Sequence, residues 1–181
     1  MIWDSDLWRE MLMADALRLE DIQKFENLSG NNRELGFEIE KIIFIGAYAI
    51  RKLIEAQKLL TKTESMRVSL TAYNRTKSHL TRLNWHHLEK HFDLEKAQQK
   101  TKSLLQTVNL ISHSFIFAGH ISEDYKLEGF WFASDRSKNQ WLYYLPLRDW
   151  TEILLTASDS WPTQCRWTID PDTQEEKIIN T

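Results

Sequence analysis

The sequence predicts an α+β protein, with a helical N-terminal half packed on an antiparallel β-sheet in the C-terminal third. Apolar residues recur with a helical period through the first part of the chain, and the period changes to strand-like alternation after His113. Short connections between the later apolar runs are typical of antiparallel hairpins. The 181 residues suffice for one domain with its own core. We therefore expect a single domain over 1–181, with a helical part (1–60), a mixed and basic middle (61–113), and antiparallel strands plus one helix (114–181).

Two long helices are expected in the first part. Asp4 or Ser5 can cap a helix that runs to about Asn27, before a Ser- and Asn-containing break at 28–32. A second helix from about Arg33 to Gln57 carries apolar residues on more than one stripe, so we expect it to be the most buried helix. A third helix is predicted within 94–113. The segment 73–91 is compatible with either a loop or a helix.

Strands are expected at 66–72, 114–121, 127–133 and 140–145, because apolar and polar residues alternate there. If Ser134 pairs with Asn139, Phe132 faces Trp141 and Phe130 faces Tyr143 across the hairpin. A helix from Pro146 to about Ala157 and a final hairpin, 164–169 with 175–179, complete the chain.

The composition excludes several classes of protein. No apolar run approaches the roughly 18–20 residues that a membrane span needs, and the N-terminus lacks the features of a signal peptide. The one cysteine, Cys165, excludes an internal disulfide. No glycine-rich phosphate loop, nucleophile elbow or dinucleotide fingerprint is present, so we expect no cofactor. Together these observations favour a soluble protein of the cytoplasm.

A basic segment interrupts an otherwise acidic chain. The formal charge is −3, yet residues 57–103 contain ten Lys or Arg and four Asp or Glu. Basic and aromatic side chains interleaved in this way can bind single-stranded RNA or another anionic partner through charge and stacking. A solvated surface loop is the alternative. The candidate binding residues are Arg75, Lys77, Arg82, Trp85, His87, Lys90 and His91, with Tyr73 as a further stacking residue.

The same segment concentrates four of the six histidines at 79–91. On a continuous helix, His87, His91 and Glu95 would share one face and could ligate a metal. No His-Glu-x-x-His pattern or cysteine pair accompanies them, so a solvated helix face is favoured and no metal site is predicted.

A different pair of residues suggests catalysis. Asn109 and His113 lie four residues apart, on one face of the third predicted helix. They resemble the second half of the Arg-Asn-x-x-x-His motif of HEPN helical domains, and the segment 49–56 is similar to a helix of that family. The resemblance implies a metal-independent ribonuclease, in which Arg and His polarise the RNA 2′-hydroxyl and the scissile phosphate; other members of the family are inactive or purely interacting. Val108 occupies the arginine position here.

Two further readings accompany this resemblance. Arg82 and His87 also fit the Arg-x4-His spacing of these nucleases. His113 at a helix C-terminus and Asn109 bonded to a neighbouring loop would equally be structural. Over most of its length the chain also resembles a family of small uncharacterised bacterial proteins, through segments 51–56, 109–117, 134–136 and 142–145. That resemblance implies a natural intact domain and no particular activity.

Tryptophan is concentrated in the last third, at positions 131, 141, 150, 161 and 167. A sheet buried on one face would leave Trp131, Leu142 and Tyr144 on the other. Either the Pro146 helix, the tail hairpin or a second subunit in a homodimer must then cover them. The sequence therefore favours a non-enzymatic binding or interaction protein, acting through its aromatic sheet and basic middle, with a HEPN-like ribonuclease or degenerate ribonuclease as the alternative.

Overall fold

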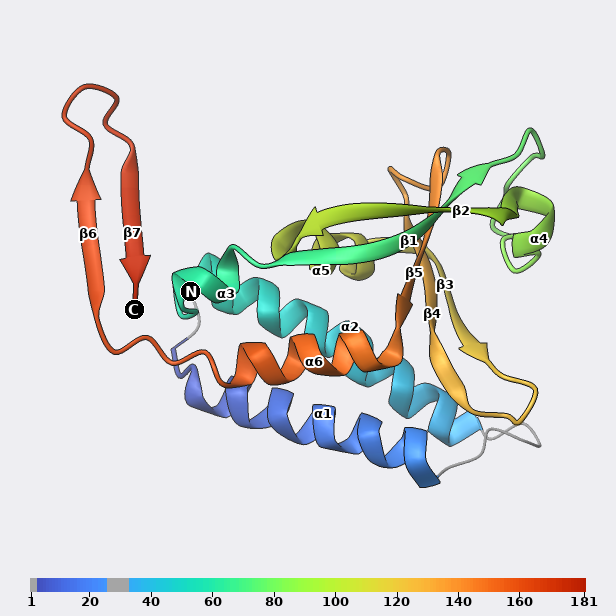
Figure 1. The fold of residues 1–181 in the computed structure, drawn as a ribbon, viewed down its shortest axis with the longest axis horizontal. Helices are drawn as coiled ribbons and strands as arrows, with labels where there is room; N and C mark the ends of the chain where they lie inside the picture. The colour runs from blue at the N-terminus through green and yellow to red at the C-terminus, as the bar shows by residue number, and fades with distance from the viewer. Residues whose placement is uncertain (1–2, 26–32) are drawn as a thin grey trace.

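The computed structural model describes residues 3–25 and 33–181 and shows an α+β fold (Figure 1). The predicted end of the first helix near Asn27 and the break at 28–32 lie outside the described residues. The long helices are α1 (Asp6–Phe25), α2 (Arg33–Glu55) and α6 (Leu147–Ser158), and the shorter ones are α3 (Thr61–Glu64), α4 (Leu88–His91) and α5 (Leu104–Ser112). The strands are β1 (Arg67–Arg75), β2 (Phe92–Ser103), β3 (Ser114–Ile121), β4 (Leu127–Ser134), β5 (Trp141–Pro146), β6 (Cys165–Ile169) and β7 (Glu176–Asn180).

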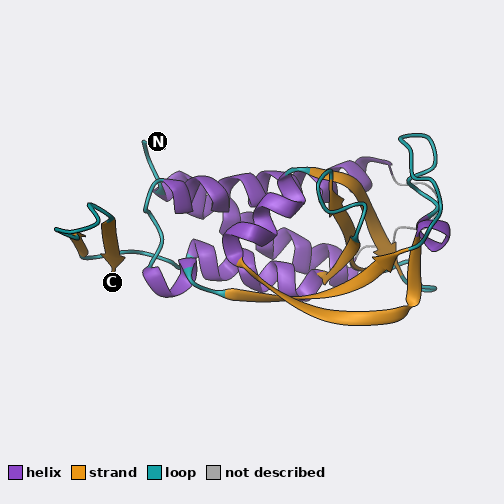
Figure 2. Cartoon of the chain, turned by 90° about the horizontal axis from the view of Figure 1, so that it is seen from above, coloured by secondary structure: helices purple, strands orange, loops and turns teal. Residues whose placement is uncertain are grey.

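Five antiparallel strands form the main sheet, in the order β2-β1-β5-β4-β3. The three strands of the C-terminal part are joined by hairpins, as the short connections predict. The two strands of the basic middle extend the sheet beyond β5. One face of the sheet packs against the helices, which lie together beside it (Figure 2).

The helical layer places α2 centrally, as its apolar pattern predicts. Its buried side chains meet α5 on one side and α1 and α6 on another. Gly46 allows the close approach of α6, because a Cβ at this position would lie 2.9 Å from a methyl group of Leu154 and 3.3 Å from the Trp150 ring. This packing fixes α2 against α6, while the contacts of α2 with α5 place the C-terminal turns of α2 beside the candidate site.

The predicted third helix is wrong in its first half. Residues 92–103 form β2, which pairs with β1 from Arg67 opposite Ser103 to Tyr73 opposite Ala97. The helix begins only at Leu104, because Ser103 caps it: the Ser103 Oγ accepts from the Gln106 N–H, and the Gln106 side chain accepts from the Ser103 N–H. Ala97 and Leu105, expected to face inward, are exposed.

The register of the β4–β5 hairpin also differs from the prediction. Phe132 lies opposite Tyr143 and Phe130 opposite Leu145, two residues away from the expected partners. The difference arises in the turn, since Gln140 donates its N–H to the Ser137 carbonyl and so stays outside the strand. A shift of two residues preserves the faces of the strands, so the predicted division into two faces is unaffected.

The second face of the sheet is partly covered by the connection between β1 and β2. Leu80, Trp85 and Leu88 from this loop pack with a small cluster that includes Leu142. The expected cover was α6, the tail hairpin or a second subunit. The loop, which was not among these, supplies part of the cover, because its apolar side chains fold back over the strands that it joins. Leu142 is buried, while Trp131 and Tyr144 remain half-buried.

The predicted tail hairpin is present as β6 and β7, which pair only with each other. It projects from the end of the molecule where α6 ends (Figure 1). None of the described helices has the length and hydropathy needed to cross a membrane.

Candidate functional site

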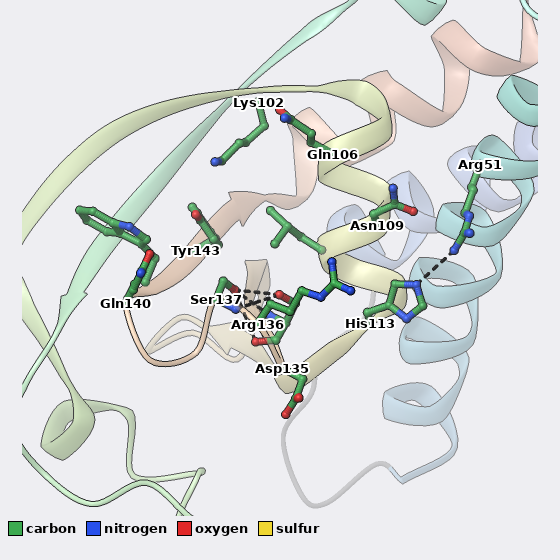
Figure 3. Close-up of a pocket in the computed structure, with 13 residues that line it drawn as sticks. Arg51, Lys102, Gln106, Asn109, His113, Asp135, Arg136, Ser137, Gln140 and Tyr143 are labelled. Carbon is green, nitrogen blue, oxygen red and sulfur yellow. Dashed lines mark hydrogen bonds between the residues drawn. The ribbon is translucent and has the colours of Figure 1, made fainter.

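A cavity of about 700 Å³ opens where α2, α5, the end of β2 and the β4–β5 turn converge (Figure 3). Both residues of the predicted catalytic pair, Asn109 and His113, lie in its wall. Most of the lining side chains are polar, and three of them carry a positive charge. The lining residues are Arg51, Lys102, Gln106, Asn109, Leu110, His113, Ser134, Asp135, Arg136, Ser137, Gln140, Trp141 and Tyr143.

The nearest neighbour of His113 in the cavity wall is an arginine from a different helix. Arg51 Nη1 lies 3.1 Å from His113 Nε2 (Figure 3). The position before Asn109 in the sequence is Val108, which is fully buried in the core. An Arg–His pair therefore forms across the α2–α5 packing, although no arginine precedes Asn109 on its own helix.

The hydrogen-bond roles in this pair follow from its chemistry. A guanidinium only donates hydrogen bonds, so His113 Nε2 is the acceptor in this contact. In that tautomer the ring proton lies on Nδ1, through which the imidazole can donate a hydrogen bond to an anion.

Arg51 is oriented by a carboxylate one turn along α2. Its Nε donates to Glu55 Oε1 at 2.7 Å, and Lys52 Nζ donates to the other oxygen of Glu55 at 2.6 Å. These two hydrogen bonds, the one from Lys52 having the larger effect, lower the pKa of Glu55 to about 2. Glu55 therefore stays ionised and holds Arg51 with its Nη1 toward His113.

Arg136 reaches the cavity from the β4–β5 turn, and its guanidinium points toward Asn109 and His113 (Figure 3). The turn is held by reciprocal bonds between two serines. Ser134 N donates to Ser137 Oγ at 2.9 Å, and Ser137 N donates to Ser134 Oγ at 3.1 Å. Side-chain bonds of this kind stabilise a tight turn, so Arg136 projects from a fixed base.

The acidic residue of the lining is already paired. Asp135 accepts a hydrogen bond from Lys138, which lowers the pKa of the Asp135 carboxyl group, with a smaller contribution from Arg82. Because this charge is compensated, the cavity keeps an excess of positive charge from Arg51, Lys102 and Arg136.

The opposite end of the cavity is aromatic. Trp141 and Tyr143 from β5 lie below basic side chains of β2: Lys100 Nζ is 4.2 Å from the centre of the Trp141 ring, and Lys102 Nζ is 5.8 Å from that of Tyr143. A cation over a ring stabilises both groups. The cavity therefore has an arginine-rich end beside α2 and an aromatic end beside β5.

Asn109 lies between these ends. Its Oδ1 is buried and has no hydrogen-bond partner among the described residues. A buried amide oxygen without a partner costs roughly 1–3 kcal/mol.

The basic middle divides into structural and exposed residues. Arg75 Nη1 and Nη2 bond Ser78 and the His91 carbonyl at 2.8–3.0 Å, and burial lowers the pKa of Arg75. His91 is 2% exposed, with its nitrogens bonded to Ser78 Oγ and the Asn84 carbonyl. Arg75 and His91, both predicted as binding residues, thus organise the loop, and Trp85 packs beneath it.

The remaining predicted binding residues stay on the surface. Lys77, Arg82 and Lys90 are exposed and His87 is half-buried. Arg82 is close enough to Asp135 to affect its titration, so the loop approaches the cavity rim there. None of these residues lines the cavity.

The histidines at 79–91 do not form a ligand set. The helix α4 ends at His91 and β2 follows at once, so His87, His91 and Glu95 share no helix face. Within residues 3–25 and 33–181, no group of three or more His, Cys, Asp or Glu side chains could hold a metal ion.

The chain matches no protein-family model, no curated protein and no solved structure. The site must therefore be interpreted from its own geometry. Sequence reasoning found Asn109 and His113 but missed Arg51, Lys102 and Arg136, which approach from three other elements. The sequence drew attention to Arg51 and Arg136 through the segments 51–56 and 134–136 of the family resemblance, and to the turn at 134–137 through its two serines, but it did not indicate that they share a site.

Proposed function

We propose that the protein is a non-enzymatic binding protein of the cytoplasm whose cavity takes a phosphate-bearing ligand, single-stranded RNA being the partner that fits best. The observation that carries this proposal is the convergence of Arg51, Lys102 and Arg136 on one cavity whose acidic residue is already paired. Arginine forks match the oxygens of a phosphate and bind it in preference to neutral groups.

The two ends of the cavity support a nucleotide as the bound unit. Phosphate oxygens would meet Arg51, Arg136 and the Nδ1 proton of His113. The base would stack on Trp141, which is half-exposed at the other end. Stacking on an aromatic side chain contributes about 1–3 kcal/mol per base. Further nucleotides would pass the rim near Arg82 and reach the exposed lysines of the 76–91 loop.

A second candidate function is a HEPN-like ribonuclease. The contact between Arg51 and His113 favours it, because this contact supplies the arginine that the sequence motif lacks. Cleavage through the 2′-hydroxyl also needs a base for its proton, and His113 Nε2 is occupied by Arg51. Binding without cleavage is therefore the better-supported function.

One pair of assays separates the two functions. A fluorescently labelled single-stranded RNA is titrated with the protein at low salt, and the same mixture, without added metal, is analysed on a denaturing gel. We expect binding and intact RNA. Metal-independent cleavage by the wild type that disappears in His113→Ala, while that variant still binds RNA, would establish the ribonuclease instead.

A second measurement tests the orientation of the nucleotide. Trp141→Ala should weaken competition by a nucleoside monophosphate roughly 5- to 150-fold, from the energy of one stacked base, and leave competition by inorganic pyrophosphate unchanged. Equal weakening of both competitors would show that the base does not stack on Trp141.

We also propose a homodimer as a partner state. The second face of the sheet leaves an aromatic row half-exposed, in which the ring centres of Trp131 and Tyr144 are 4.8 Å apart. Because the 76–91 loop already covers the neighbouring cluster, this row offers a second copy less apolar surface than the sequence suggests. The tail hairpin offers a second copy more exposed apolar surface.

A further inference from the structure

The β6–β7 hairpin has an apolar face that no residue within 3–25 and 33–181 covers. Cys165, Trp167 and Ile169 alternate along β6 and share one side, and Ile178 lies directly opposite Trp167 on β7. Trp167 is 56% exposed and Ile169 is 44% exposed. We refer to residues 164–181 as the arm and to this side as its apolar face. Glu176 and Asn180, opposite Ile169 and Cys165, lie at the two ends of the apolar face, and the other side carries Arg166, Thr168, Lys177 and Ile179.

The arm is joined to the rest of the molecule only at its base, so far as the described residues show. Asn180 is buried there: its N–H donates to Thr61 Oγ1 at 2.8 Å, and its amide donates to the carbonyls of Gln57 and Leu59 at 3.0 and 3.1 Å. Beyond this anchor the arm stands away from the helices and the main sheet (Figure 1, Figure 2). All five residues of β6 are exposed.

A free two-stranded hairpin is marginally stable in water, because it has no third strand or helix to bury its apolar side. An exposed stripe of Trp and Ile on such a hairpin therefore indicates a surface that is covered in the working protein. The base of the arm is firmly held, so this surface is presented in a defined direction.

The charges along the arm show which partner fits. Its four carboxylates, Asp170, Asp172, Glu175 and Glu176, all lie at or beside the turn. Lys177 lies beside Glu176, so the turn end carries four acidic residues and one basic residue. The other positive charges lie at the anchored end: Arg166, and Lys58 and Lys62, which flank the residues that anchor Asn180. An acidic tip, an apolar centre and a basic base make the arm complementary to itself when two copies lie antiparallel.

We propose that the apolar face of the arm packs against the apolar face of the arm of a second copy of this chain, antiparallel and around a twofold axis. Trp167 of each copy lies at the centre, and the acidic turn of each arm meets the positively charged, anchored end of the other. A twofold contact of this kind uses the same surface twice, so one self-complementary arm completes the interface. Burial of the two tryptophans supplies the apolar centre that dimer interfaces require.

The first test is the mass of the protein in solution. Sedimentation velocity should give the mass of two chains at micromolar concentration. Trp167→Asp should reduce the mass twofold, because it places a charge at the centre of the contact. Thr168→Asp is the matched control, since it makes the same charge change on the opposite side of the same strand, and it should leave the dimer intact. A monomeric wild type, or equal effects of the two variants, would overturn the proposal.

The second test addresses the antiparallel geometry. Opposed arms place Cys165 of one copy across from position 169 of the other, with the two packed faces about 10 Å apart, so Ile169→Cys should give a covalent dimer with a short bifunctional maleimide reagent that spans about this distance. Within one chain these positions are separated by about 13 Å along a strand, too far for the same reagent. The wild type and Thr168→Cys should give no covalent dimer. A wild-type dimer in which Ile169→Cys links no better than Thr168→Cys would show that the arm packs elsewhere on the second copy.

Discussion

Reversal of the charge at Arg136 is the most direct test of the cavity as an anion site. Arg136 is exposed on the β4–β5 turn, so Arg136→Glu should leave the stability of the protein nearly unchanged. The substitution should weaken RNA binding strongly, because the guanidinium that it removes points into the cavity beside Asn109 and His113 (Figure 3). A hydrogen bond to a charged group contributes about 1.5–3 kcal/mol, so its loss should weaken binding roughly 10- to 150-fold.

The salt dependence of binding gives an independent measure of the same contact. If Arg51, Lys102 and Arg136 each neutralise one phosphate, the logarithm of the affinity should fall with log salt at a slope of about −2 for a single strand. Arg136→Glu should reduce the slope to about −1.4. The assay is fluorescence anisotropy with a labelled single-stranded RNA at several salt concentrations.

The matched control is Arg148→Glu. It makes the same change in net charge on α6, where the Arg148 side chain is 84% exposed and does not line the cavity. We expect the wild-type slope and nearly the wild-type affinity. If Arg148→Glu weakens binding as much as Arg136→Glu, RNA responds only to the overall charge of the protein. If the wild type binds no RNA at low salt, the cavity has another ligand.

Three further predictions concern the stability of the fold and of the 76–91 loop. Gly36→Ala should stabilise the protein by up to about 1 kcal/mol, because the new Cβ meets open space. Gly46→Ala gains the same helix propensity but should lose about 1–3 kcal/mol through overpacking against Leu154. Urea denaturation of the two variants compares these effects. Burial is the main cause that raises the pKa of Tyr144 to about 12 in the folded protein, above the value near 10 of an unfolded chain. The free energy of unfolding should therefore fall as the pH rises from about 10 toward 12. Tyr144→Phe should not show this loss. Arg75→Ala should make the 76–91 loop sensitive to limited proteolysis and cost about 1–3 kcal/mol, since it removes the donors to buried carbonyl groups.

Local patterns predict much of this fold because they report burial directly. The apolar stripes of α2 and the alternation in β3 correspond to the observed elements, and Pro146 precedes α6 as expected. The strand β2 was predicted as helix because its residues are mostly polar and Thr101 is its one β-branched side chain, so its pairing with β1 decides that it is a strand. The capping box of Ser103 and Gln106 marked the true start of α5 in the sequence.

The site was predictable only where its residues share one element. Asn109 and His113 lie four apart on α5, so their spacing was visible. The contact of Arg51 with His113 joins residues separated by 62 positions, and it depends on how α2 crosses α5. Sequence spacing carries no information about such a crossing. Likewise Arg75 and Arg82 look alike in the sequence, but only the fold directs Arg75 inward to bond its own loop.

The arrangement around Arg51 also explains why a site with an arginine and a histidine favours binding. Glu55 stays ionised down to about pH 2, so it fixes Arg51 at any physiological pH. Arg51 donates to His113 Nε2, which leaves Nδ1 of the imidazole as the donor that faces a ligand. A ligand phosphate thus meets two guanidinium groups, an ammonium group and an imidazole N–H, while the Asp135 carboxylate of the same lining is paired with Lys138. Such a set stabilises negative charge that is already present.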